Sequence, residues 1–313
     1  VFTTASIGIA VSEEGLDGPE HLIRHADSAM YRAKARGKAR YEIFDVAMHE
    51  RAVTLLQLET DIRAAVHKKQ FRLVYLPVVN MMTERITGFE ALVRWEHPER
   101  GLVSPGSFVP LAEETGLIIP LGRWIMEEAC RQMAEWVDRY PKLQDLTVSV
   151  NLAAKQLRQP DLVAQVKSAI QQSGLAPNRF KLEIAETVLM DDPESNLEIV
   201  SELRDWGVLV QIDDFGTGSS SLSYLNRFRV DTLKIDRSFI SQVGVPGEKS
   251  AVVQAMITLA NQLGIRVIAE GVETPQQSEK LLGFKCEQAQ GYLFSQPLNA
   301  READELLAAE VKA

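Results

Sequence analysis

The sequence has 313 residues and a formal net charge of −9 at pH 7, with 45% hydrophobic and 25% charged residues. That length fits one large domain of about 200–250 residues with a smaller piece beside it, and the composition is typical of globular proteins. The acidic balance argues against contacts with long nucleic acids, and the lack of any run of about 18 apolar residues argues against membrane contact by this segment.

The first 45 residues predict the tail of a domain. The opening stretch, residues 1–10, predicts a strand and not a signal peptide, and residues 19–37 predict a helix that ends at Gly37. One strand and one helix cannot bury a core of their own. We therefore expect a piece of a longer protein, whose upstream part can carry a sensor or a membrane anchor.

A second predicted helix, residues 48–70, leads into a regular alternation of strands and helices. The expected strands lie at 71–77, 86–94, 145–152, 180–186, 207–213, 231–236, 265–270 and 284–291. Helical periodicity is found between them at 118–139, 160–172, 194–205, 248–263 and 274–282. Eight alternating strands favour an α/β fold, a TIM-like (β/α)8 barrel, over an open doubly wound sheet. No glycine-rich fingerprint follows the first strand, which weakens the open-sheet alternative further.

Seven consecutive predicted strands, from the second onward, each end in a polar or ionisable side chain. These residues are Glu90, Asn151, Glu183, Asp213 with Asp214, Lys234, Glu270 and Gln290. In a barrel the C-terminal strand ends form the mouth, where active sites lie. Taken singly, each residue has an ordinary explanation as a solvated loop residue or a cap, and Asp213–Asp214 before FGTGSSS fits a turn.

The cysteines and histidines form no recognisable metal motif. Cys130 and Cys286 are far apart and lie in no CxxC pair, which predicts two reduced core thiols in a cytoplasmic protein. The five histidines lack zinc spacing, since HLIRH at residues 21–25 has no further ligands beside it.

The acidic residues are interpreted differently once they are expected to lie together at one mouth of the barrel. The carboxylates near the strand ends are Glu90, Glu183, Glu186, Asp213, Asp214, Glu270 and Glu273. They would repel one another, and Lys234 supplies only one positive charge. Hard divalent cations would compensate, and an oxygen-only ligand set favours Mg²⁺ or Mn²⁺ over zinc. Because paired ions serve in-line attack on a phosphodiester, the residues predict a two-metal hydrolase with an unspecified substrate.

Extended motifs resemble those of the EAL-domain cyclic di-GMP phosphodiesterases. The motifs are GFEALVRWEHPERGLVSPGSFVPLAEETGLI, SVNLA, LEIAET, DDFGTGSSSLSYL, LKIDRSFI, VIAEGVET and AQGYLFSQPL, in the family's order and spacing over roughly residues 56–300. The resemblance implies a TIM-like barrel whose first strand is antiparallel to the rest. It also implies hydrolysis of cyclic di-GMP to linear pGpG in bacterial second-messenger signalling.

The resemblance implies a metal ligand set for two Mg²⁺ or Mn²⁺ ions. The residues matching the ligands of one ion are Glu90, Asn151, Glu183 and Asp213. The residues matching those of the other are Asp213, Asp214 and Glu270, with Glu273 in support. We expect Ca²⁺ to inhibit, because it takes more ligands at longer distances.

The resemblance also implies roles around the metals. Lys234 matches the lysine that orients or deprotonates the attacking water. Glu186 matches the glutamate that anchors the loop at residues 213–221, and that loop with the adjacent helices implies a homodimer. The residues that match substrate contacts are Leu92, Arg94 and Gln290.

Two positions depart from the family's usual pattern. Leu76 stands before Pro77 where the family usually has Gln, and Ser219 stands where the loop usually has Tyr. Neither position is a metal ligand, so we expect effects on affinity or loop dynamics and not on the chemistry.

Residues 1–45 resemble the C-terminal end of a GGDEF diguanylate cyclase domain, through ASIGIAV and HADSAMYRAKARGKAR. The GGDEF motif itself is absent, and Ala39 stands where that family commonly has Asn, so we expect no cyclase chemistry. The predicted organisation is a GGDEF fragment at 1–45, a linker helix at 46–55 and a phosphodiesterase domain at 56–313.

Two rival functions stay open at this point. A catalytically silent cyclic di-GMP receptor of the same fold would typically lose part of the EAL motif, the Asp pair or a metal-binding Glu, and all are intact here. A barrel enzyme that uses Mg²⁺ to stabilise an enolate shares the fold, but Asp213–Asp214 and the full motif series argue against it.

Overall fold

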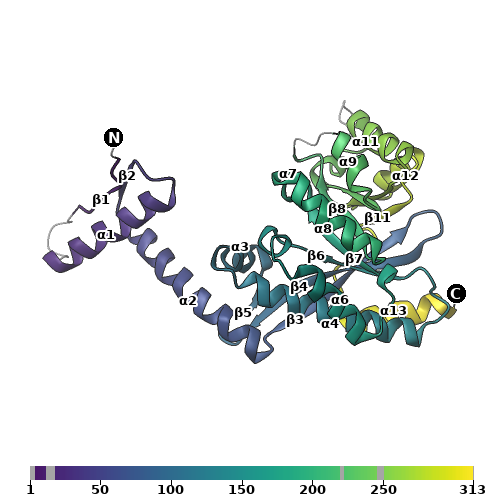
Figure 1. Ribbon diagram of the computed structural model, residues 1–313, viewed down its shortest axis with the longest axis horizontal. Helices are drawn as coiled ribbons and strands as arrows, with labels where there is room; N and C mark the ends of the chain where they lie inside the picture. Colours follow the sequence, from purple (N-terminus) through teal and green to yellow (C-terminus); the bar gives the residue numbers. More distant parts are fainter. Residues whose placement is uncertain (1–3, 12–17, 219–221, 245–249, 313) are drawn as a thin grey trace. The chain divides into compact units, whose positions relative to one another are not determined.

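Figure 1 shows the computed structural model, which describes residues 4–11, 18–218, 222–244 and 250–312. The chain divides into two compact units, Val1–Ala64 and Ala65–Ala313. In the described part of the chain, no helix is long and apolar enough to cross a membrane.

The first unit contains a small α/β fragment. Strands β1 (Ile7–Ile9) and β2 (Tyr41–Ile43) pair in parallel, and α1 (Pro19–Ala35) connects them. The sequence predicted β1 and α1 but not β2, because three residues are too few to show strand alternation. The next helix, α2 (Val46–Lys68), matches the predicted second helix within two residues at each end.

The second unit is a closed eight-stranded barrel. Its strands are β3 (Phe71–Asn80), β4 (Arg85–His97), β6 (Thr147–Asn151), β7 (Phe180–Ala185), β8 (Leu209–Phe215), β9 (Thr232–Ile235), β10 (Arg266–Glu270) and β11 (Gln288–Gln290). β3 closes the barrel by pairing with both β4 and β11, antiparallel to each. The other neighbours pair in parallel. The TIM-like fold and its antiparallel first strand are thus confirmed.

Helices cover the outside of the barrel (Figure 1). The helices that the sequence predicted are α4 (Ile118–Arg139), α6 (Leu162–Ser173), α8 (Pro193–Asp205), α11 (Ser250–Gln262) and α12 (Pro275–Gly283). The elements that it did not predict are β5 (Gly101–Val103), α3 (Pro105–Thr115), α5 (Ala154–Leu157), a 3₁₀ turn (Pro177–Arg179), α7 (Glu186–Asp191), α9 (Leu222–Phe228), α10 (Arg237–Ile240) and α13 (Ala300–Lys312). Most of these are too short to show a hydrophobic period.

The strands are buried on both faces, and the two faces differ in chemistry. On β7, Leu182 and Ile184 are fully buried, while Lys181 and Glu183 occupy the alternate positions. Since side chains alternate along a strand, the apolar pair faces the helices and the polar pair faces the barrel interior. This alternation places the polar strand ends of the sequence at one mouth.

Candidate active site

Lys234 lies at the centre of the carboxylate cluster. Its Nζ donates to Glu183 Oε2 at 2.7 Å and to Glu90 Oε2 at 3.1 Å. It also lies 2.6 Å from Glu270 Oε1 and 3.2 Å from Asp213 Oδ1. The lysine is 1% exposed, and its four partners come from four other strands. The barrel therefore brings these five predicted residues into one cluster.

Two amides complete the cluster. Asn151 Nδ2 donates to Glu90 Oε1 at 3.0 Å. Gln290 Nε2 donates to Glu90 Oε2 at 2.7 Å and to Glu270 Oε1 at 2.8 Å. Gln290 is buried, whereas Asn151 at the end of β6 is exposed.

Strand register determines which residues meet. β6 pairs Asn151 with Glu183 on β7, and β7 pairs Ala185 with Asp213 on β8. The register of β8 against β9 then shifts between Ile212 and Phe215. Within that irregular stretch Asp214 adopts a left-handed conformation with φ 53° and is exposed. The shift turns two consecutive aspartates toward the mouth, which regular alternation would not allow.

The pKa values in the cluster are shifted because several charged groups lie close together and away from water. Burial raises the pKa of Glu183 to about 8, with Glu90 adding to the shift. Burial likewise raises the pKa of Glu270 to about 7 and raises the pKa of Asp214. For Glu90, burial is outweighed by Lys234 and the amides, so its pKa is lowered. Despite its own burial, Lys234 has a pKa well above the usual value because the carboxylates surround it.

The donors present fit a hard divalent cation. Ligand oxygens of Asp213, Asp214 and Glu270 lie within 4.8 Å of one another. Glu183 Oε1 is buried without a hydrogen-bond partner in the described structure. Buried oxygens of this kind are rarely left unpaired, and an oxygen-only set suits Mg²⁺ or Mn²⁺. Two further proposed ligands, Glu90 and Glu183, are held by Lys234 in this structure, as are Asp213 and Glu270.

Three predicted residues lie outside the cluster's contacts. Arg94 is on the same face of β4 as Glu90, is half-buried and donates to Val93 O at 2.9 Å. Burial lowers the pKa of Arg94. Leu92, between them along this face, is also half-buried. Glu273 is exposed, and no cation lies within 4.0 Å of its carboxylate in the parts of the chain that the structure describes.

Glu186 faces the turn after β8 and not the cluster. It is the first residue of α7 and is 1% exposed, because the chain turns directly after Ala185. Its Oε2 accepts a hydrogen bond from Gly216 N at 2.7 Å. Of the loop at 213–221 with its predicted contact to a partner subunit, residues 219–221 lie outside the described residues, and the Ser219 departure is among them.

Sequence reasoning missed Asp236. It follows Lys234 by two residues at the end of β9, caps α10 through Ser238 N at 2.9 Å, and contributes to the raised pKa of Asp214. The two-residue spacing from Lys234 in LKID was the available signal.

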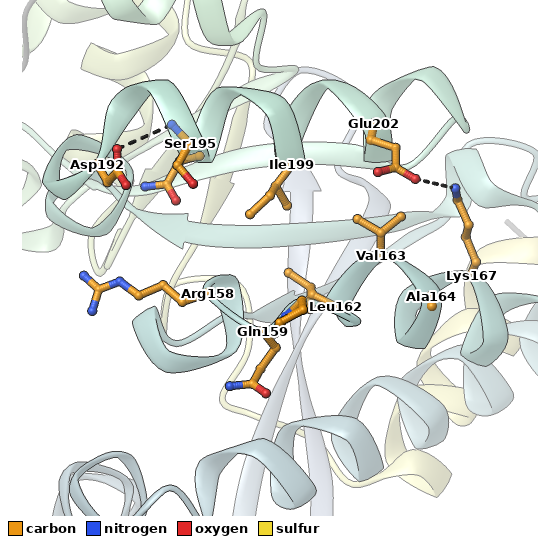
Figure 2. Close-up of a pocket in the computed structure, with 12 residues that line it drawn as sticks. Arg158, Gln159, Leu162, Val163, Ala164, Lys167, Asp192, Ser195, Ile199 and Glu202 are labelled. Atoms are coloured by element: carbon orange, nitrogen blue, oxygen red, sulfur yellow. Dashed lines mark hydrogen bonds and ion pairs between the residues drawn. The ribbon is translucent and has the colours of Figure 1, made fainter.

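A hollow of about 540 Å³ lies on the outer side of the barrel, between α6 and α8. Figure 2 shows its apolar floor, with Leu162, Val163 and Ile199, and the ion pair between Lys167 and Glu202 at 2.9 Å. No residue of the carboxylate cluster lines it, so the candidate chemistry belongs to the barrel mouth and not to this hollow.

Comparison with known proteins agrees with this fold and cluster. Residues 59–297 match the EAL domain model, and residues 1–40 match that of the diguanylate cyclase GGDEF domain. The bifunctional diguanylate cyclase/cyclic di-GMP phosphodiesterase MucR of Pseudomonas aeruginosa is 42% identical over 302 residues, 96% of this chain and 44% of MucR. The cyclic di-GMP phosphodiesterase PdeR of Escherichia coli is 37% identical over 300 residues, 96% of this chain and 45% of PdeR. The chain thus spans less than half the length of either relative.

A solved structure shows the same fold. The structure of the MucR phosphodiesterase in complex with c-di-GMP aligns with a TM-score of 0.76 and 42% sequence identity. The alignment covers 79% of this chain and 99% of that chain.

Proposed function

The chain belongs to the EAL domain family, with a GGDEF fragment at its N-terminus, and we propose that it hydrolyses one phosphodiester bond of cyclic di-GMP to give linear pGpG. The observation that carries this proposal is the cluster at the barrel mouth, where four carboxylates from four strands surround the buried Lys234. The names of MucR and PdeR support the substrate.

Two Mg²⁺ or Mn²⁺ ions are proposed as cofactors. The residues that would hold the first ion are Glu90, Asn151, Glu183 and Asp213. Those that would hold the second are Asp213, Asp214 and Glu270, with Glu273 in support. Bound there, the ions would activate water and stabilise the charge that develops on the phosphodiester oxygens.

The chain's own residues would orient the reactants. Lys234 Nζ would position the attacking water, because it is the hydrogen-bond donor at the centre of the cluster. Arg94 lies on the same strand face as Glu90, and its guanidinium would hold a substrate phosphate. Leu92 and Gln290 would contact the substrate beside it. Glu186 would hold the turn that carries Asp213 and Asp214.

The silent-receptor alternative is not favoured, because every residue whose loss would mark a receptor is present. We further propose a cytoplasmic homodimer that associates through the loop at 213–221 and the adjacent helices. The two free, buried cysteines, Cys130 and Cys286, fit a reducing compartment.

Nucleotide analysis tests the function directly. The purified chain is incubated with cyclic di-GMP and Mg²⁺, Mn²⁺, Ca²⁺ or EDTA, and the nucleotides are separated. We expect pGpG with Mg²⁺ or Mn²⁺ and none with Ca²⁺ or EDTA. Glu90→Ala should abolish the product, while the control Glu198→Ala, at an exposed position on α8, should not. Cyclic di-GMP binding without turnover under all conditions would make the chain a receptor.

A further inference from the structure

The turn after β8 sets the positions of two proposed ligands. Asp213 and Asp214 are followed by Phe215, which is 6% exposed and pairs with Ile235. Asp214 has φ 53° and Gly216 has φ 98°, so the backbone is left-handed twice within three residues. Glycine adopts a positive φ without strain, but at Asp214 this conformation persists only where the surrounding structure fixes it. The contacts of Gly216 therefore bear on where the two carboxylates lie.

One side of the turn is held by a carboxylate. Glu186 Oε2 accepts the hydrogen bond from Gly216 N at 2.7 Å. Its Oε1 lies 2.7 Å from the place where a Cβ on Gly218 would stand, so the second glycine also packs directly on Glu186.

The other side of the turn is held by two apolar side chains from different helices. A Cβ on Gly216 would stand 2.5 Å from Met256 Cε of α11, and 3.0 and 3.1 Å from Cε2 and Cζ of Phe239 on α10. Real Cβ atoms essentially never approach other atoms within 3.0 Å, so a Cβ on Gly216 would fit only if the end of Met256 moved and the Phe239 ring gave way by a few tenths of an ångström.

We infer that Phe239 and Met256 are positioning residues for the metal site. They pack against the turn at Gly216, whose amide Glu186 binds, and together these contacts fix the positions of Asp213 and Asp214. This inference rests on the proposed function for the role of the two aspartates. A metal site loses affinity when its ligands are displaced by fractions of an ångström. An ordinary packing contact would affect stability alone, whereas the inferred role predicts an effect on metal affinity.

A double-variant experiment separates these two roles. Gly216→Ala adds a methyl group where Met256 Cε lies, and Gly174→Ala is its matched control. Gly174 also has a positive φ, 73°, but no atom lies within 4 Å of its added Cβ. Mn²⁺ affinity is measured by electron paramagnetic resonance on the protein without nucleotide.

We expect Gly216→Ala to weaken Mn²⁺ affinity about tenfold, which corresponds to about 1.4 kcal/mol, and Gly174→Ala to leave it unchanged. Met256→Ala alone should weaken affinity about threefold because one wall of the turn is lost. In the Gly216→Ala chain, the same Met256→Ala should instead restore part of the affinity, since it removes the nearest of the atoms that the new methyl group meets, while the contact with Phe239 stays. An unchanged affinity in Gly216→Ala, or no restoration in the double variant, overturns the inference.

Amide hydrogen exchange gives a readout without metal. Met256→Ala and Phe239→Leu should each speed exchange of the Gly216 amide, which donates to Glu186, and leave exchange in β6 unchanged. Equal exchange in the variants and the unmodified chain would overturn the inference. Neither measurement uses cyclic di-GMP, so a chain that holds its turn but makes no pGpG disproves the proposed function alone.

Discussion

At the scale of single residues, the buried lysine decides how the acidic cluster behaves. Lys234 is the only cation within 4.0 Å of Glu90, Glu183, Asp213 or Glu270 in the described part of the chain. Removing one partner of a buried charge group leaves the others uncompensated. Its two proposed contributions, to folding and to the reaction, can be measured separately.

Lys234→Met is expected to lower kcat far more than it changes KM, because the proposed target of its ammonium is the attacking water. In EDTA the same variant should be less stable by several kcal/mol, because the four carboxylates around it, two of them buried and two half-buried, lose their counter-charge. Steady-state kinetics and urea unfolding check both effects, with Lys142→Met at an exposed position as the control. A change confined to KM would assign Lys234 to substrate binding.

Glu186→Ala is expected to weaken apparent Mg²⁺ affinity and lower kcat, because Gly216 loses the acceptor that holds its amide. Excess Mg²⁺ should partly rescue this variant. Glu183→Ala, which removes a proposed ligand, should stay inactive at any Mg²⁺ concentration. Activity titrated against Mg²⁺ for both variants compares them, and identical, unrescued inactivity would make Glu186 a ligand.

The members of the cluster could be predicted from the sequence because most of them stand at or near the end of an apolar strand, a pattern that a single sequence displays; Glu90 differs, since it lies in the middle of β4. Phe239 and Met256 could not be predicted in this way. They are apolar residues on helices, and their role comes from contact with Gly216, far away along the chain. Such contacts depend on the packing of α10 and α11 on the turn, for which no local pattern exists.

At the scale of elements, the barrel strands were predictable and their irregularities were not. All eight predicted strands overlap observed ones, and from β4 onward helices separate the barrel strands, which keeps their apolar runs distinct in the sequence. The register shift in β8 that exposes Asp214 depends on the pairing with β9. The hydrophobic period of a single strand cannot indicate such a shift. The short helices that follow β7 and β9 are too short to show a hydrophobic stripe, and only the second, α10, starts at a side-chain cap, Asp236.

Gln277, in the first turn of α12, caps that helix and also connects it to α10. Gln277 Oε1 accepts from the backbone amides of Glu273 and Thr274 at 2.8 and 3.0 Å, and its Nε2 donates to Ile240 O at 3.2 Å. Gln277→Ala should therefore destabilise the protein by about 2 kcal/mol, through lost capping and buried groups left unpaired. The neighbouring Gln276 is exposed, so Gln276→Ala should change stability by less than about 0.5 kcal/mol. Urea unfolding of the two variants measures the difference, and equal losses would contradict this account.

At the scale of the whole molecule, the stability of the metal-free protein should fall as the pH rises. The pKa of Glu183 is about 8 and that of Glu270 about 7 in the folded chain, above the value of about 4.3 for an unfolded glutamate. Between these values the folded state binds more protons than the unfolded state, so stability falls as pH rises. Lys234, whose pKa is raised, keeps its contribution throughout this window.

In EDTA, Tm should therefore fall by on the order of 5 °C between pH 5.5 and 8. Mg²⁺ should raise Tm more at pH 8 than at pH 5.5, because a divalent cation then replaces the protons. Thermal scans with and without Mg²⁺ test this, and Glu183→Gln should flatten the slope. A Tm that rises with pH in EDTA would contradict the raised pKa values.

The reversed direction of β3 determines where the polypeptide enters the barrel. Phe71 pairs with Trp95, beyond Glu90 along β4, so the first strand starts beside the mouth and runs away from it. Gln70, just before it, bonds both the backbone and the indole of the β4 end, through Glu96 N at 2.8 Å and Trp95 Nε1 at 3.3 Å. In an all-parallel barrel the entering segment would attach at the opposite end. Here the incoming segment instead joins the barrel at the rim that carries the carboxylate cluster, so a change in how Gln70 is held would act at the mouth without crossing the barrel.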